Sequence, residues 1–226
     1  MRKLIRAFVS KFRPILPAVE HRLHNLSIFR ELVIREFHKL YYEASSTGGT
    51  WLDTYWLGVP TLKCPLDLWV YQEILFETRP NLIIETGTAF GGSALFLASL
   101  CDILGSGRVV TIDISPKPER PRHERITYLT GSSTSTSVVG QVRSMIRPGE
   151  RVMAILDSDH RREHVLQELR EFAPLVSTGC YLAVEDTNIN GHPVALCSGP
   201  GPWEALDEFS RATTISWPTE ARRRAS

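Results

Sequence analysis

Short apolar runs alternate with helical patterns through the middle of the chain. The runs occupy residues 82–84, 109–113, 126–130, 152–157 and 181–186, and polar residues, glycine or proline bound them. Runs of this length are typical of strands that are buried on both faces of a parallel sheet. The segments between them carry apolar residues at helical spacing, most clearly over residues 137–146 and 160–172. The pattern therefore predicts an α/β fold, a Rossmann-like, doubly wound and mostly parallel sheet.

The first sixty residues combine a helical pattern with an aromatic segment. Apolar residues recur at helical spacing over residues 18–44, and the serine- and glycine-rich segment 45–50 breaks this pattern. Residues 51–60 are dense in aromatic rings, which suit either a flap over a pocket or, more commonly, a hydrophobic seal between helices. A further helix is predicted over residues 65–77, with an inner face formed by Leu66, Trp69, Val70, Glu73 and Ile74.

These patterns divide the chain into three parts. Residues 1–60 form N-terminal helices and an aromatic cap segment, residues 61–210 form the α/β domain, and residues 211–226 form an atypical tail. The tail ends in an arginine-rich run, which is typical of a disordered terminus.

A glycine-rich turn follows the first predicted strand. Gly87, Gly91 and Gly92 lie between this strand and a helix that Ser93 is placed to cap. Because glycine has no Cβ atom, the backbone can turn sharply and approach a ligand closely. A strand, a glycine turn and a helix N-terminus together form a nucleotide-sized pocket at the carboxyl edge of a parallel sheet. The run nevertheless departs from the Gly-x-Gly-x-x-Gly dinucleotide fingerprint.

Two carboxylates indicate which nucleotide this pocket binds. Glu85 precedes the first glycine by two positions, where its charge would repel a pyrophosphate but suits a ligand that carries an ammonium and a sulfonium group. Asp113 ends the next strand, where it can accept hydrogen bonds from both ribose hydroxyls. Small hydroxyl residues follow the third strand at Ser132, Ser133, Thr134 and Ser135, and they either contact an adenine edge or, more commonly, cap a helix. The pattern favours S-adenosylmethionine.

Carboxylates also follow the fourth and fifth strands, at Asp157, Asp159, Glu185 and Asp186. The ends of parallel strands point the same way, so these charges converge on one cleft and repel one another unless a cation lies between them. Oxygen ligands favour Mg²⁺, which would lower the pKa of an attacking hydroxyl. His160 is then either the general base or an exposed histidine of the first helical turn, and Asp159 is either a ligand or a helix N-cap.

Composition and charge narrow the classes of function. A net charge of +1 gives no general reason to expect nucleic-acid binding. Four cysteines without metal-ligand spacing are typical of reduced thiols, and we expect a cytoplasmic protein. Residues 1–16 combine basic and apolar residues at helical spacing, as in a helix that contacts an anionic membrane surface or a partner.

Several longer motifs resemble one family. Over residues 25–210 the chain resembles the cephalosporin hydroxylase / rhamnosyl O-methyltransferase family, through residues 56–60, 64–69, 84–88, 156–160, 184–188 and 199–203. The resemblance implies a class I S-adenosylmethionine-dependent methyltransferase fold in residues 61–210. It also implies Mg²⁺ held by acids after strands four and five. We expect a methyl transfer to a hydroxyl of a sugar, glycolipid or natural product.

The resemblance can be carried over residue by residue. It places Glu85, Gly87 and Asp113 at the methyl donor and Asp159, Glu185 and Asp186 at the metal. Catechol-type methyltransferases, which resemble the chain more distantly, would place the first metal ligand at Asp157 instead, so both assignments stay open. His160 and Asp159 are the catalytic candidates. The candidates for binding the methyl donor are Glu85, Gly87, Thr88, Gly91, Ser93, Asp113, Ser132, Ser133 and Asp157.

The C-terminus departs from the pattern of this family. A complete fold of this class continues with two strands that form an antiparallel hairpin at the sheet edge, and residues 211–226 do not provide them. Two alternatives to an active methyltransferase are a cofactor-binding scaffold without activity and a nicotinamide-dependent oxidoreductase without a complete fingerprint. We also expect a homo-oligomer.

Overall fold

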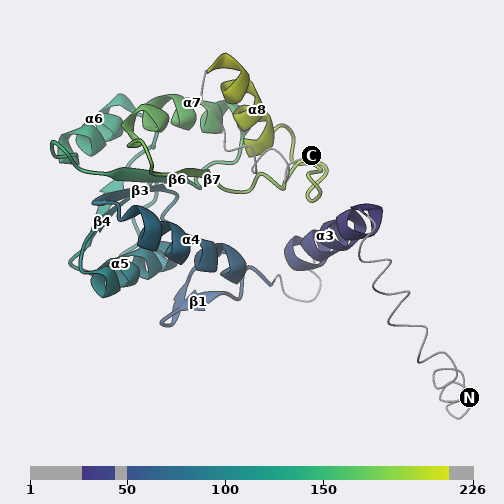
Figure 1. Cartoon of the computed structure of the whole chain (residues 1–226), viewed down its shortest axis with the longest axis horizontal. Coiled ribbons are helices and arrows are strands. Elements are labelled where there is room, and N and C mark those ends of the chain that lie inside the picture. The colour runs from purple at the N-terminus through teal and green to yellow at the C-terminus, as the bar shows by residue number, and fades with distance from the viewer. Residues whose placement is uncertain (1–26, 44–49, 214–226) are drawn as a thin grey trace, which may run out of the picture.

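A five-stranded sheet forms the centre of the protein, in a computed structural model that describes residues 27–43 and 50–213 (Figure 1). The strands are β3 (Leu82–Thr86), β4 (Arg108–Asp113), β5 (Ile126–Thr130), β6 (Val152–Leu156) and β7 (Leu182–Val184). They lie in the order β5-β4-β3-β6-β7, and all neighbouring strands are parallel. Because later strands are added on both sides of β3, the predicted doubly wound fold is confirmed.

Helices cover both faces of this sheet. Figure 1 shows α4 (Pro65–Thr78) and α5 (Gly92–Leu104) on one face, and α6 (Thr136–Met145), α7 (Arg162–Phe172) and α8 (Pro202–Ala212) on the other. A short 3₁₀ helix, Ala173–Leu175, follows α7. The strands therefore need apolar residues on both faces, which explains why their sequences are continuous apolar runs.

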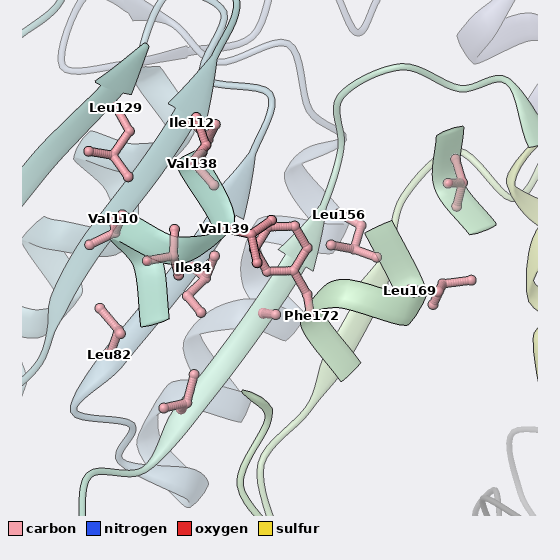
Figure 2. Packing of buried hydrophobic residues seen from close by; sticks show 14 of the residues in the cluster. Leu82, Ile84, Val110, Ile112, Leu129, Val138, Val139, Leu156, Leu169 and Phe172 are labelled. Atoms are coloured by element: carbon pink, nitrogen blue, oxygen red, sulfur yellow. The ribbon is translucent and has the colours of Figure 1, made fainter. Parts of the chain in front are cut away.

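The pleat of the strands divides the core into two clusters. Ile83, Met153 and Ile155 pack with Leu75 of α4 and Leu97 of α5. The residues between them point to the other face. There Leu82, Ile84, Val110, Ile112 and Leu156 pack with Val138 and Val139 of α6 and with Leu169 and Phe172 of α7 (Figure 2). The two clusters hold the strands in register, and this fixes where the polar residues beyond the strand ends lie.

A small hairpin precedes the sheet domain. It consists of β1 (Tyr55–Trp56) and β2 (Val59–Pro60), and helix α3 (Ser27–Tyr42) lies before it in the chain. The ring of Trp56 packs edge-on against Phe96 at 4.9 Å between centroids and donates a hydrogen bond from Nε1 to Ser99 Oγ at 3.2 Å. Trp56 is thus part of a seal over α5, whereas Trp51 lines the cavity described below.

The predicted inner face of α4 is wrong. Leu66, Trp69 and Val70 are exposed, and the buried positions are Leu68, Tyr71, Leu75 and Thr78. Apolar residues occupy almost every side of this helix, so their spacing does not define one face. The polar residue Tyr71 is buried because it has a partner at the sheet edge, which the apolar pattern could not show.

Two helix starts also differ from the predictions. The helix after β6 begins at Arg162, and Arg161 is its N-cap, so His160 lies in the preceding loop instead of the first helical turn, and Asp159 is not the N-cap. Helix α5 has Gly91 as its N-cap, in a left-handed conformation at φ 84°, and no side chain caps it. Ser93 therefore does not cap this helix.

Some predictions fall outside the described residues. These are the helix of residues 1–16 with its membrane contact, and the absent hairpin as far as it concerns residues 214–226. The first two residues of the predicted tail, Arg211 and Ala212, belong to α8. Within the described residues, the helices are too short or too polar to span a bilayer.

Candidate active site at the carboxyl edge of the sheet

The carboxyl ends of the strands border a cavity of about 810 Å³. This volume is within the range of roughly 300–1,000 Å³ that small-molecule sites occupy. Among the predicted donor-binding residues, those that line it are Gly87, Thr88, Ser93, Asp113, Ser132 and Ser133. The predicted metal and catalytic residues line it too, at Asp157, Asp159, His160, Glu185 and Asp186. Acids that follow three different strands thus share one cavity.

Glu85, in contrast, does not line this cavity and is fully buried near the end of β3. Its Oε2 atom accepts a hydrogen bond from Thr111 Oγ1 at 2.7 Å, while Oε1 has no hydrogen-bond partner among the described residues. Burial raises the pKa of Glu85 to about 7, and attraction to the charge of Lys63 limits the rise. A buried carboxylate oxygen without a partner is costly, so it marks a place where a ligand donor is missing.

Gly87 brings the glycine turn against the end of β6. A Cβ atom at this position would lie 1.7 Å from the backbone oxygen of Asp157, and φ is 87°. Only glycine allows this approach. Gly91, in contrast, does not line the cavity, and a Cβ atom there would meet Pro121 and Tyr128 at 3.1 Å.

The carboxylate of Asp113 is fixed at the end of β4. Its Oδ2 atom accepts a hydrogen bond from the backbone of Ala89 at 2.8 Å and lies 2.9 Å from the buried Arg120. Its Oδ1 atom accepts a hydrogen bond from the backbone of Ser115 at 2.9 Å. These contacts hold the carboxylate at the cavity wall with its orientation set, as a residue that positions a ribose requires.

Ser132 and Ser133 do not cap the following helix. Ser135 is the N-cap of α6, and its side chain accepts a hydrogen bond from the backbone of Val138. Ser133 Oγ instead donates to the buried Glu168 at 2.5 Å and lies 3.1 Å from Nε2 of His164, while Ser132 contacts Thr134. Of the hydroxyl residues that follow β5, Ser135 is thus the one that caps a helix, and the predicted capping is confirmed at that position.

Lys63 is the cation that lies among the strand-end acids. Its buried Nζ atom is 2.6 Å from Asp157 Oδ2 and 3.0 Å from Glu185 Oε1. Tyr71 donates a hydrogen bond to the same Glu185 oxygen. Burial alone would lower the pKa of Lys63, but the charges of Asp157 and Glu185 outweigh burial and raise this pKa well above its usual value.

A second group of potential ligands lies beside this lysine. Ligand atoms of Asp157, His160 and Asp186 all lie within 4.8 Å of one another. His160 Nε2 is 3.0 Å from Asp186 Oδ2 and 3.4 Å from Asp157 Oδ1. Hydrogen bonds to Asp157 and then to Asp186 raise the pKa of His160 to about 10, so the histidine is held as a cation by the two acids.

Asp159 does not join this group. Both of its carboxylate oxygens contact Arg161, whose Nε atom is 3.0 Å from Oδ1 and 2.9 Å from Oδ2. Hydrogen bonds from the Arg161 side chain lower the pKa of Asp159 to about 2. Of the two acids between which the sequence does not choose, Asp157 is therefore the one that lies with His160 and Asp186.

Comparison with known proteins assigns the chain to a family. The family described as "Rhamnosyl O-methyltransferase/CmcI" matches residues 49–224. A "Rhamnosyl O-methyltransferase" of Mycobacterium leprae is 42% identical over 184 residues, which cover 79% of this chain and 78% of that protein. The chain belongs to the rhamnosyl O-methyltransferase/CmcI family. The resemblance seen in the sequence motifs is confirmed.

Solved structures of CmcI share the fold of this family member. The "CmcI-N160 apo-structure" is 26% identical, with a TM-score of 0.56 over 70% of this chain, and the chain spans 66% of the length of that structure. The "cmcI-D160 Mg-SAM" structure is 23% identical, with a TM-score of 0.54 over 70% of this chain and 67% of that one. At this identity, the similarity establishes a shared fold only. The fold is that of class I S-adenosylmethionine-dependent methyltransferases.

Three polar residues in and just before α4 were not predicted to belong to the site. Lys63, Asp67 and Tyr71 are four residues apart, and each lies at or beside the cavity or its acids. Burial raises the pKa of Asp67 to about 6. The spacing of Asp67 and Tyr71 is a signal, because residues at i and i+4 share one side of a helix, whereas Lys63 lies just before the helix. The more numerous apolar residues between them concealed it.

Proposed function

We propose that this protein is an S-adenosylmethionine-dependent O-methyltransferase that methylates a hydroxyl of a rhamnosyl sugar and uses Mg²⁺. Family membership supports methyl transfer, because the relatives that share 42% identity are named rhamnosyl O-methyltransferases. The observation that carries the proposal is the cavity itself, in which acids from separate strand ends face one space. A cationic donor and a divalent cation both need such an arrangement.

The donor would be held by the residues around the glycine turn. Glu85 has an unpaired buried oxygen, and Asp113 has a fixed carboxylate at the cavity wall. Gly87, Thr88, Ser93, Ser132 and Ser133 line the space between the strand ends, and Gly91 shapes the turn from outside it. A carboxylate at Glu85, two positions before the first glycine of the turn, would repel the pyrophosphate of NAD and suits a sulfonium cofactor, which argues against the oxidoreductase alternative.

The metal would be held by Asp157 and Asp186, with Glu185 beside them. Asp157 Oδ1 and Asp186 Oδ2 face His160 and fit a hard cation that prefers oxygen ligands. When bound, Mg²⁺ would stabilise the alkoxide character of the acceptor oxygen. His160 accepts the hydroxyl proton at Nε2, which requires that another cation first takes over the charge of the two acids.

The acceptor would enter where the cavity is lined by α3, the segment before β1 and the loop after β7. Tyr42, Trp51, Ile189 and Val194 from these segments border the cavity, and aromatic and aliphatic side chains suit the apolar face of a deoxysugar and its aglycone. The aglycone would be a small molecule or a glycolipid. Assembly as a homo-oligomer, a cytoplasmic location and contact of residues 1–16 with a membrane remain predictions.

Separate titrations and a transfer assay test this function. Calorimetric titration with S-adenosylmethionine should give saturable heat, and heat with NAD alone would contradict the proposal. Transfer of a labelled methyl group to phenyl rhamnoside should exceed transfer to phenyl glucoside, and should fall with chelator or in Asp186→Ala. Donor binding without transfer to any hydroxyl acceptor would favour the inactive scaffold instead.

A further inference from the structure

The buried ammonium of Lys63 shares carboxylates with the candidate metal site. Its side chain is 5% exposed, and it precedes α4, whereas Asp157 and Glu185 follow β6 and β7. The lysine therefore joins three segments of the chain at one point. Tyr71 adds a hydrogen bond to Glu185 from the next turns of α4, so the lysine is part of a built polar contact and not a chance surface pair.

The contacts divide the two oxygens of Asp157 between two partners. Oδ2 faces Lys63 at 2.6 Å, and Oδ1 faces His160 at 3.4 Å. The lysine thus neutralises part of the charge of the strand-end acids and leaves one oxygen of Asp157 directed toward the group of Asp157, His160 and Asp186. Without Lys63, His160 would still pair with Asp157, but no ion pair to Glu185 would remain among the described residues, and the two partly buried acids would lose the cation that lies between them.

We propose that Lys63 is a built-in counter-ion, which keeps Asp157 and Glu185 together when no metal is bound and lowers the affinity of the site for a divalent cation. The inference rests on the metal dependence of the proposed function. A fixed ammonium and a divalent cation attract the same carboxylates and repel each other in a region of low dielectric. The site is consequently preformed, but it binds its metal weakly and exchanges it readily.

Mn²⁺ binding to the full-length protein tests this role. Electron paramagnetic resonance measures the free Mn²⁺ during titration, and thermal unfolding is followed with Mn²⁺ and with chelator. Lys63→Met should melt at a lower temperature than wild type in chelator, because two acids lose their counter-ion. It should bind Mn²⁺ at least tenfold more tightly, and Mn²⁺ should raise its melting temperature more than that of wild type.

Three further variants separate charge from packing. The ammonium of Lys117, which lines the same cavity, lies 3.8 Å from the centroid of the Phe90 ring. The ion pairs of Asp157, Glu185 and Asp186 among the described residues do not include it, so Lys117→Met should change Mn²⁺ affinity less than twofold. Tyr71→Phe removes a hydrogen bond to Glu185 but no charge, and should not tighten binding. Lys63→Arg keeps the charge and should keep the weak affinity. If Lys63→Met does not fold in chelator, recovery of folded protein during refolding in Mn²⁺ supports the inference.

The outcomes distinguish this inference from the proposed function. Equal or weaker Mn²⁺ binding by Lys63→Met overturns the counter-ion role while the metal site stands. Binding by Lys63→Met but not by wild type overturns the metal dependence and supports the counter-ion role, because the lysine then replaces the metal. Binding by neither protein overturns both.

Discussion

Nε2 of His160 lies 3.0 Å from Oδ2 of Asp186, across the cavity edge formed by the loops after β6 and β7. This contact joins the proposed base to an acid that follows the neighbouring strand. We expect His160→Gln to lower kcat for methyl transfer by about 100-fold or more, because general bases typically contribute factors of about 10² to 10⁴. Donor affinity, measured by calorimetry, should remain unchanged.

A histidine that does not line the cavity provides the control for this prediction. His123 pairs with Asp102 at 3.0 Å, and it does not line the cavity. His123→Gln should therefore leave kcat within about twofold of wild type, since its ring contacts Asp102 and Arg125, which do not line the cavity. An unchanged kcat in His160→Gln would show that another group takes the proton.

The second prediction concerns the close contact of Gly87 with Asp157. Gly87→Ala places a Cβ atom 1.7 Å from a backbone oxygen, which no side-chain movement can relieve. We expect a loss of at least about 3 kcal/mol in the free energy of unfolding, or no folded protein, because the cost of the steric clash adds to the cost of a non-glycine residue at positive φ. Gly149→Ala also has a positive φ, but its Cβ atom meets nothing within 4 Å, so it should cost only about 1–2 kcal/mol. Urea denaturation measures both.

The sheet could be predicted from the sequence because its strands are buried on both faces. A short continuous apolar run such as residues 152–156 predicts a buried strand, and the turns that follow these runs are rich in glycine and acidic residues. The strand ends then follow from the topology, and so does the convergence of Asp113, Asp157 and Asp186 on one edge. Local pattern was sufficient here since each strand carries its own signal.

The division of roles among the acids could not be predicted in this way. Lys63 reaches Asp157 across 94 positions in the sequence, and no local pattern encodes such a contact. Asp159 forms an ion pair with Arg161 two residues later, an alternative that metal-ligand spacing does not reveal. A carboxylate at a strand end has several potential partners, and only the packed structure decides among them.

The third prediction concerns the ion pair of Arg108 with Glu150, which lies far from the cavity residues. Glu150 accepts hydrogen bonds from Arg108 at 2.6 and 2.8 Å, and chiefly these bonds lower its pKa to about 2. Because the pKa is lower in the folded state, the stabilisation is complete above about pH 4.5 and is lost as pH falls toward 2.

Glu150→Gln should therefore lower the free energy of unfolding by roughly 1–2 kcal/mol at pH 7, as expected for a hydrogen bond to a charged group. This difference in the free energy of unfolding should shrink as the pH falls from 4.5 to 2, and urea denaturation at several pH values measures it. A difference that stays constant over this range would show that the charge of Glu150 contributes nothing.

The last prediction is that Glu85 opposes folding while it supports donor binding. Burial raises the pKa of Glu85 to about 7, so the folded protein holds this proton at pH values where the unfolded chain has lost it. Stability should accordingly fall as pH rises from about 4.5 to 7 and stay level above that. We expect Glu85→Gln to raise the free energy of unfolding at pH 8 by roughly 1–3 kcal/mol.

The same variant should bind S-adenosylmethionine at least tenfold more weakly, because the cationic donor loses its carboxylate. In wild type this affinity should also fall as pH drops below about 7, where Glu85 gains a proton. Glu163, whose side chain is 77% exposed, provides the matched control: Glu163→Gln should change neither quantity. Lower stability together with unchanged donor affinity in Glu85→Gln would mean that Glu85 has only a structural role at the end of β3.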